Sequence, residues 1–136
     1  MENELTVRDL TEEDYEIICE WWKWWRWPVL SKSALPDNGK SGFIVEKNNI
    51  PIVCGFLYLT NSTGALLEWI VSNPKYKEKD RKEAIELLIN SAEASCKNMG
   101  ITYMFSIGRS KHLIQTHEKL GWYVNEKPSY EIIKKL

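Results

Sequence analysis

"SGFIVEKNNIPIVCGFLYLTNSTGALLEWIVSN", residues 41–73, is the stretch of the chain that decides the fold. It contains three runs rich in β-branched and aromatic residues, which are typical of strands. The polar NN at 48–49 and NST at 61–63 are typical of hairpin turns. The stretch therefore predicts three antiparallel strands, over residues 41–47, 50–61 and 64–73.

The segments on either side of these strands add helices. Before them, residues 5–10 alternate like a short strand, and a helix begins at Thr11 and ends before Pro28. After them, apolar residues recur at three- and four-residue steps from Lys79 to Met99, which predicts a second helix that Gly100 ends. The remaining predicted elements are a strand over 101–107, a helix over 111–121 and a last strand over 129–135.

The predicted order, β-α-β-β-β-α-β-α-β, indicates an α+β fold of the α/β-sandwich type. Such a fold has a mixed, mostly antiparallel sheet with helices on both faces. At 136 residues, of which 43% are hydrophobic, the chain is long enough to bury a core of its own. No repeat or linker-like composition divides it, so we expect a single domain over residues 1–136.

Charge and composition argue against several classes of protein. A net charge of −1 gives no overall attraction to nucleic acid or to an anionic membrane. The apolar run ALLEWIV, residues 65–71, is too short to span a bilayer, and the acidic N-terminus does not have the pattern of a signal peptide. Three separated cysteines are typical of reduced thiols, and two histidines outside any Cys/His cluster predict no metal site. These features favour a cytoplasmic protein with no membrane partner.

Five of the seven tryptophans lie in "EWWKWWRWP", residues 20–28. Helical spacing places Trp22 and Trp25 on the apolar stripe of the first helix, so we expect both in the core. Trp21, Trp24 and Trp27 fall away from this stripe and predict a recognition surface. The rings can line a pocket for an aromatic or cationic acceptor, stack on nucleobases, or form a protein-binding or dimer surface. If the helix phase differs, most of them are buried instead.

Two further segments carry a resemblance to a known family. "IVSNPKYKEKDRKEAIELL" (70–88) and "THEKLGW" (116–122), together with the element order, resemble the GNAT superfamily of acyl-CoA-dependent N-acyltransferases over about residues 4–134. The tryptophan-rich helix and the segment "LYLTNS…EWIVSNP" also resemble GNAT-like proteins encoded by bacteriophages, which implies a host cytoplasm. The resemblance implies transfer of an acetyl group from acetyl-CoA to an amine.

The resemblance also implies where acetyl-CoA binds. In this family the pyrophosphate binds the free amides at the start of the long helix, where the helix dipole favours anions. The pantetheine arm pairs with an open strand edge, which corresponds here to Trp69, Ile70 and Val71.

The turn before the long helix departs from the family pattern Q/R-x-x-G-x-G/A. Lys77 stands at its basic position, but Asp80 and Lys82 stand at its two glycines. Asp80 and Glu83 have the spacing of a D-x-x-E capping box, which predicts that the Asp80 carboxylate takes the amides that a pyrophosphate needs. Basic side chains can hold phosphates instead, and the candidates are Lys75, Lys77, Lys79, Arg81 and Lys82. Two interpretations of this segment remain open: it binds phosphates, or it is a helix start whose charged side chains are solvated.

Glu68 is the candidate base for taking the proton of the amine, because burial within an apolar strand raises the basicity of a carboxylate. Strand alternation places it with Leu66, Ile70 and Ser72. If Glu68 is only structural, it needs a cationic or backbone partner, since an unpaired buried carboxylate is costly.

His117 stands where the resemblance places the family's acid, a tyrosine that protonates the leaving thiolate. An imidazole can do the same, although an ordinary surface histidine also fits the pattern. Tyr103, Tyr123 and Tyr130 are the alternative phenols.

The leading hypothesis is therefore an N-acetyltransferase with a small-molecule or macromolecular amine acceptor. Trp21, Trp24, Trp27 and Tyr58 are predicted to surround that acceptor. One alternative is a GNAT-fold binding protein that has lost CoA and acts through its tryptophan-rich surface. Another is a phage nucleotide- or DNA-modifying acyltransferase whose substrate base stacks on the rings. A homodimer is compatible with each.

Overall fold

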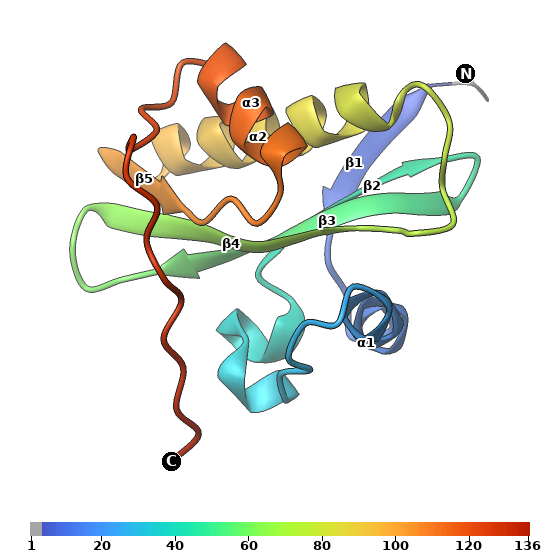
Figure 1. Ribbon diagram of the computed structural model, residues 1–136, viewed down its shortest axis with the longest axis horizontal. Helices are drawn as coiled ribbons and strands as arrows, with labels where there is room; N and C mark the ends of the chain where they lie inside the picture. The colour runs from blue at the N-terminus through green and yellow to red at the C-terminus, as the bar shows by residue number, and fades with distance from the viewer. Residues whose placement is uncertain (1–3) are drawn as a thin grey trace.

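The computed structural model describes residues 4–136, which form a five-stranded sheet in the order β1-β2-β3-β4-β5 (Figure 1). Strands β1 to β4 run antiparallel to their neighbours, whereas β5 runs parallel to β4. The strands are β1 (Leu5–Asp9), β2 (Gly42–Lys47), β3 (Ile50–Leu59), β4 (Gly64–Ser72) and β5 (Tyr103–Ser106). The helices are α1 (Asp14–Trp24), α2 (Arg81–Asn98) and α3 (Lys111–Lys119), with 3-10 turns at Lys32–Ala34 and Pro36–Gly39.

Helices cover both faces of the sheet, as predicted. Helices α2 and α3 lie on one face, and α1 and the 3-10 turns lie on the other (Figure 1). The core beneath α2 contains Val53 and Leu88, and the core beneath α1 contains Trp22 and Phe56. Of the helices in residues 4–136, none has the length and apolar character that crossing a membrane requires.

The central hairpins form where the sequence predicts them. Asn48 and Asn49 join β2 to β3 with φ angles of 52° and 64°, a left-handed conformation that asparagine tolerates well. The local turn chemistry therefore fixes the register of this pair, in which Lys47 faces Ile50.

A bulge in β4 changes which side chains share a face. Cys54 of β3 pairs with Val71 and Phe56 pairs with Glu68, so one extra residue of β4 lies between these pairs. Trp69 adopts a positive φ of 55° at this point. Ile70 therefore packs under α2 while Trp69 and Val71 pack toward α1, and the predicted alternation of Glu68 with Ile70 is wrong.

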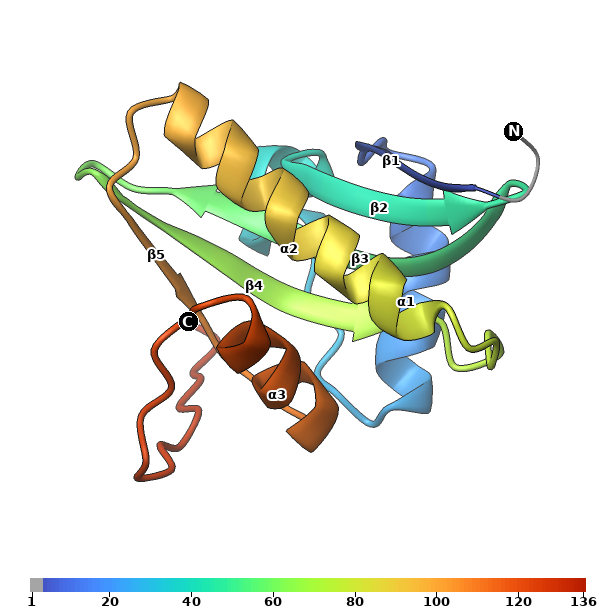
Figure 2. The same cartoon turned by 90° about the horizontal axis from the view of Figure 1, so that it is seen from above.

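Strands β4 and β5 separate beyond the first half of β4. Pairing with β5 covers only Gly64 to Leu67. Within residues 4–136, the second half of β4, from Glu68 to Ser72, has no strand neighbour on this side. Figure 2 shows β5 diverging from β4, with α3 beyond the gap.

The predicted last strand is absent. Residues 129–135 are irregular and exposed, and they follow α3 as an extended tail. The alternating pattern of a strand is stable only against a neighbouring strand, and the tail has none along its length.

The predicted phase of the first helix is partly wrong. The buried side chains of α1 are Asp14, Ile18, Trp21 and Trp22, so Trp21 belongs to the core and Trp25 does not. The helix ends at Trp24, and Arg26 turns the chain with a φ of 63°. Trp25 therefore leaves the stripe on which regular helical spacing would place it, and it is 38% exposed.

Candidate functional site

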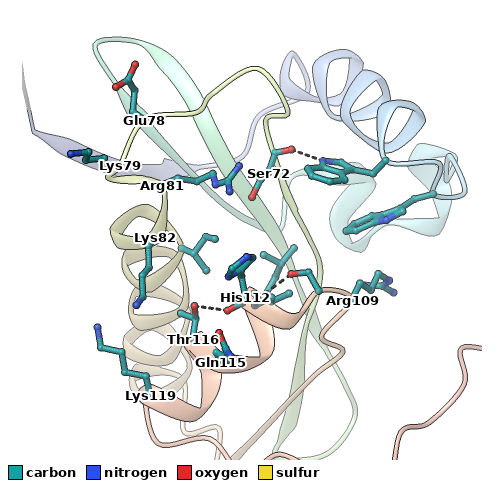
Figure 3. A pocket seen from close by; sticks show the side chains of 16 residues that line it. Ser72, Glu78, Lys79, Arg81, Lys82, Arg109, His112, Gln115, Thr116 and Lys119 are labelled. Carbon is teal, nitrogen blue, oxygen red and sulfur yellow. Dashed lines mark hydrogen bonds between the residues drawn. The ribbon is translucent and has the colours of Figure 1, made fainter.

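A cleft of about 540 Å³ lies where β4 and β5 separate, between the end of β4, the start of α2 and α3 (Figure 3). Two tryptophans that follow α1 close its far side. The lining residues that matter to its chemistry are Trp25, Trp27, Ile70, Ser72, Lys79, Arg81, Lys82, Arg109, His112 and Lys119.

Basic side chains gather at the α2 end of the cleft. Lys79, Arg81 and Lys82 line it, and Lys119 joins them from α3. Figure 3 shows Arg81 reaching into the cleft, and Glu78 adds one carboxylate to the lining at this end. Of the predicted phosphate-binding residues in the described chain, Lys75, Lys77 and Asp80 do not line the cleft.

The capping box predicted at the start of α2 does not form. The Asp80 carboxylate accepts hydrogen bonds from Lys47 Nζ at 2.7 Å and from the Tyr76 hydroxyl at 2.6 Å. These partners hold the pKa of Asp80 below its ordinary value, and burial together with Asp80 raises the pKa of Tyr76 to about 12. Within residues 4–136 no side chain caps the helix, so its first amides are not taken by Asp80.

The open edge of β4 forms the floor of the cleft. Ile70 and Ser72 line it, but the Trp69 and Val71 side chains turn to the opposite face. The Trp25 indole N–H donates to the carbonyl oxygen of Ser72 at 2.9 Å. The tryptophan that the sequence assigns to the core therefore lies at the end of the cleft.

Glu68 is buried on the α1 side of the sheet and forms a bidentate ion pair with Arg109. Its Oε1 accepts from Arg109 Nη1 at 2.9 Å and its Oε2 accepts from Nη2 at 3.0 Å. The backbone N–H of Trp69 also donates to Oε1, at 2.8 Å. Glu68 thus has both the cationic and the backbone partner expected of a structural carboxylate.

Aromatic rings surround this ion pair. The Arg109 guanidinium lies 4.1 Å from the centroid of the Trp69 ring and 5.2 Å from that of Trp27. Tyr58 is close enough for Glu68 to contribute to its raised pKa, although burial is the larger cause. The predicted residues Glu68, Trp27 and Tyr58 therefore lie together around Arg109.

His117 does not line the cleft. It is buried in a smaller pocket of about 260 Å³ beside β5, with its ring edge-on to Trp122 at 4.8 Å. Its Nδ1 is 2.8 Å from the carbonyl oxygen of Leu113, while Nε2 has no hydrogen-bond partner in the described chain. Burial lowers the pKa of His117, which favours the neutral ring. The histidine that lines the cleft is His112.

Two of the predicted acceptor-side tryptophans lie elsewhere. Trp21 is buried in the core, and Trp24 is 60% exposed and stacks edge-on against Trp25 with 4.7 Å between ring centroids. Cys54 is fully buried, and burial raises the pKa of its thiol, so this cysteine belongs to the core rather than to the site.

Sequence reasoning did not assign Arg109, His112 or Trp25 to the site. Arg109 lies in a short loop after β5 and belongs to no motif, and its partner Glu68 is 41 residues away. Of these three residues, only Trp25 lies in a segment that the sequence marks as unusual, the tryptophan cluster at 20–28.

No family model and no curated protein matches the sequence. Solved structures do match the fold, at low sequence identity. AAC(6')-Iy in complex with the bisubstrate analogue CoA-S-monomethyl-acetylneamine has a TM-score of 0.65 and 18% identity, with 97% of this chain and 99% of that chain covered. A GCN5-related N-acetyltransferase from Ralstonia eutropha has a TM-score of 0.61 and 16% identity, with coverage of 95% and 99%.

A third match is N-acetylglutamate synthase from Neisseria gonorrhoeae, complexed with coenzyme A and L-arginine. It has a TM-score of 0.71 and 15% identity, and the match covers 92% of this chain but 29% of that longer chain. The chain therefore has the fold of the GNAT acetyltransferases, as its sequence resemblance predicts. Because one fold hosts many functions, the fold alone does not decide the activity of this chain.

Proposed function

We propose that this chain is an N-acetyltransferase that carries an acetyl group from acetyl-CoA to an amine. The observation that carries the proposal is one cleft that joins an open strand edge to a basic helix N-terminus without a side-chain cap. These two features offer backbone pairing for an amide-rich arm and donors for phosphates. The CoA ligands of two structural neighbours agree with this use of the fold.

The phosphates are assigned to the α2 end of the cleft. Arg81 and Lys82 come from the first turn of α2, and Lys79 precedes it. Side-chain cations here replace the close backbone approach that glycines give in the family pattern. Lys47 neutralises Asp80 from outside the cleft, so this carboxylate does not face the phosphates unpaired.

The pantetheine arm is assigned to the backbone of β4 between Trp69 and Val71. This is where β5 no longer pairs with β4, so backbone groups on this side remain for a ligand. Ile70 and Leu113 supply apolar contacts from β4 and α3.

Glu68 is the proposed base for the amine, because it is the carboxylate of β4 beside the open edge. Three donated hydrogen bonds hold it, so accepting a proton requires Arg109 to release one oxygen. We assign protonation of the leaving thiolate to His112, in place of the predicted His117, because His112 lines the cleft.

The direct test is calorimetric titration of the purified chain with acetyl-CoA. Binding at micromolar concentration in the wild type, weakened in an Arg81→Ala/Lys82→Ala variant, supports the cofactor site. Lys77→Ala is the matched control, because Lys77 is a basic residue of the same segment that does not line the cleft.

A binding protein without CoA is the second candidate. The observation in its favour is the hydrogen bond from Trp25 to Ser72, which occupies a carbonyl at the end of the open edge. It predicts no binding of acetyl-CoA even at millimolar concentration. Trp24→Ala would then abolish capture of a partner while leaving the fold intact.

A nucleobase is an alternative acceptor, because it can stack on the tryptophans that lie outside the core. Trp24 exposes a large ring, on which a base can stack. Quenching of tryptophan fluorescence by nucleosides or single-stranded DNA, lost in Trp24→Ala, would support it. An unchanged spectrum would exclude this acceptor.

A further inference from the structure

We propose that one edge of Arg109 is a carboxylate-binding subsite for the acceptor, which the free protein fills with its own Glu131. This inference rests on the proposed function, because it takes the ligand of the subsite to be the acceptor amine. It names the substrate class: an amine that also carries a carboxylate, such as an amino acid.

Arg109 is held too firmly to be a mobile surface side chain. Glu68 binds its two terminal nitrogens, Trp69 stacks on its face, and its side chain is only 11% exposed. An arginine fixed in this way presents its remaining donors in a fixed direction, which is how proteins recognise planar carboxylates.

The donors of Arg109 are incompletely used. A guanidinium presents Nε–H and one N–H of Nη2 side by side on one edge, where the two oxygens of a carboxylate can accept both. Glu131 of the tail pairs with Nη2 on Arg109. Nε is buried and has no hydrogen-bond partner among residues 4–136. A carboxylate that is not tethered to the tail can take a position in which it accepts from both Nε–H and Nη2–H. Glu131 accepts only from Nη2.

The tail that supplies Glu131 is weakly attached. In the described part of the chain, the ion pair between Glu131 and Arg109 is the one hydrogen bond or ion pair that joins residues 125–136 to the rest of the domain. The neighbours of Glu131 in the tail, Tyr130 and Ile132, are 92% and 93% exposed. A single ion pair with a partly exposed partner contributes little free energy, so a ligand can displace it.

Charge decides which ligand replaces the tail. Glu68 and Arg109 cancel one another, so an amine without an anionic group gains nothing from the edge that Glu131 leaves. A ligand carboxylate restores the lost bond and adds the one to Nε. An amine next to that carboxylate then lies in the same cluster as Glu68, the proposed base.

The subsite can be tested without acetyl-CoA. The experiment follows the arginine Nε–H signals of the ¹⁵N-labelled chain, residues 1–136, by NMR during titration with propionate, with uncharged propionamide as the paired probe. The signal of Arg109 is assigned by its loss in Arg109→Lys. We expect propionate, and not propionamide, to shift this signal.

Removing the competing carboxylate sharpens the test. In Glu131→Gln we expect propionate to bind about tenfold more tightly, because an intramolecular competitor has been removed. Glu126→Gln, which neutralises an exposed glutamate of the same tail, should leave the affinity unchanged. Equal affinity in the wild type and Glu131→Gln, or equal shifts by propionate and propionamide, would overturn the proposal.

The substrate class is tested separately by acetyl-CoA turnover with amino acids and with the corresponding amino-acid amides. Turnover of the free acids and weak turnover of the amides is expected. Propionate binding without any binding of acetyl-CoA would keep the subsite and reject the transferase. Turnover of amines that lack a carboxylate, without propionate binding, would keep the transferase and reject this inference.

Discussion

Trp69 and Arg109 are stacked, with the guanidinium carbon 4.1 Å from the centroid of the indole ring. The bulge in β4 makes this contact: the extra residue turns the Trp69 ring to the α1 side of the sheet, where the loop after β5 brings Arg109. The same arginine lines the cleft and pairs with Glu68. One backbone irregularity therefore connects the open edge of β4 to the charged cluster beside it.

Replacing Glu68 with Gln should destabilise the fold, because it leaves the mostly buried Arg109 without its principal counterion. We expect a loss of about 3–5 kcal/mol in the free energy of unfolding, measured by urea denaturation. Glu46→Gln is the matched control, since its partner Arg8 is 39% exposed and such pairs contribute at most about 1 kcal/mol. Similar losses in both variants would show that Glu68 is no more important to stability than a surface residue.

Replacing Arg81 and Lys82 with Ala should weaken acetyl-CoA binding by about tenfold or more, because hydrogen bonds to charged groups contribute about 1.5–3 kcal/mol each. The affinity is measured by calorimetry at two salt concentrations. Salt should weaken binding to the wild type more than to the variant, since screening acts on the lost charges. Affinity that stays at the wild-type level would remove the phosphates from this end of the cleft.

The two histidines give opposite predictions for turnover. His112→Gln should lower kcat by about a hundredfold, which is the lower range for loss of a general acid or base, while His117→Gln should leave kcat nearly unchanged. Initial rates at saturating acetyl-CoA check this, with circular dichroism to confirm that both variants are folded. The reverse result would return the acid to His117 and require its pocket to open toward the cleft.

Sequence reasoning succeeded where the signal was local. Asn48 and Asn49 fix a hairpin by their own conformational preferences, and the four-residue spacing of Leu88, Ala92 and Cys96 fixes the buried face of α2. It failed where the conformation of a segment depends on residues that are distant in the sequence. The bulge at Trp69 depends on the register with β3, and the strand expected over 129–135 needs a neighbour that the tail does not have.

The candidate site shows the same division. The charged segment at the start of a helix marked Lys79, Arg81 and Lys82 as candidates, and residues so close in sequence line the same end of the cleft. The role of Asp80 could not be predicted, because Lys47, which draws its carboxylate away from the helix amides, is 33 residues earlier in the chain. The position of Trp25 depended on where α1 ends, which helical spacing alone does not determine.

Two tryptophans of the same cluster should differ sharply in their contribution to stability. Trp21 is 3% exposed and packs in the core beneath α1, so Trp21→Ala should cost about 3–5 kcal/mol of unfolding free energy. Trp24 is 60% exposed, and Trp24→Ala should change the free energy of unfolding by about 0.5 kcal/mol. Thermal and urea unfolding of both variants measure the difference. Equal costs would contradict the helix phase described for α1.

His117 should make stability depend on pH. Burial lowers its pKa below the ordinary value of 6.5, so the unfolded chain binds this proton at a higher pH than the folded chain does. The free energy of unfolding that neutral His117 provides is therefore fully present above pH 6.5 and is lost as the pH falls through the lower folded pKa. The carboxylates Asp14 and Asp80, whose pKa values are also lowered, lose their contributions only at more acidic pH.

The contribution of His117 is isolated by comparing the wild type with His117→Gln, which cannot take up a proton. Urea denaturation between neutral pH and about pH 5 should show stability falling in the wild type and a shallower slope in the variant. His112→Gln is the control on the same helix, because it removes an exposed imidazole and keeps the buried ring of His117. Parallel slopes for the wild type and His117→Gln would mean that the His117 ring takes up its proton equally well in the folded and unfolded chains. That result would be incompatible with a neutral ring enclosed against Trp122 and hydrogen-bonded to Leu113.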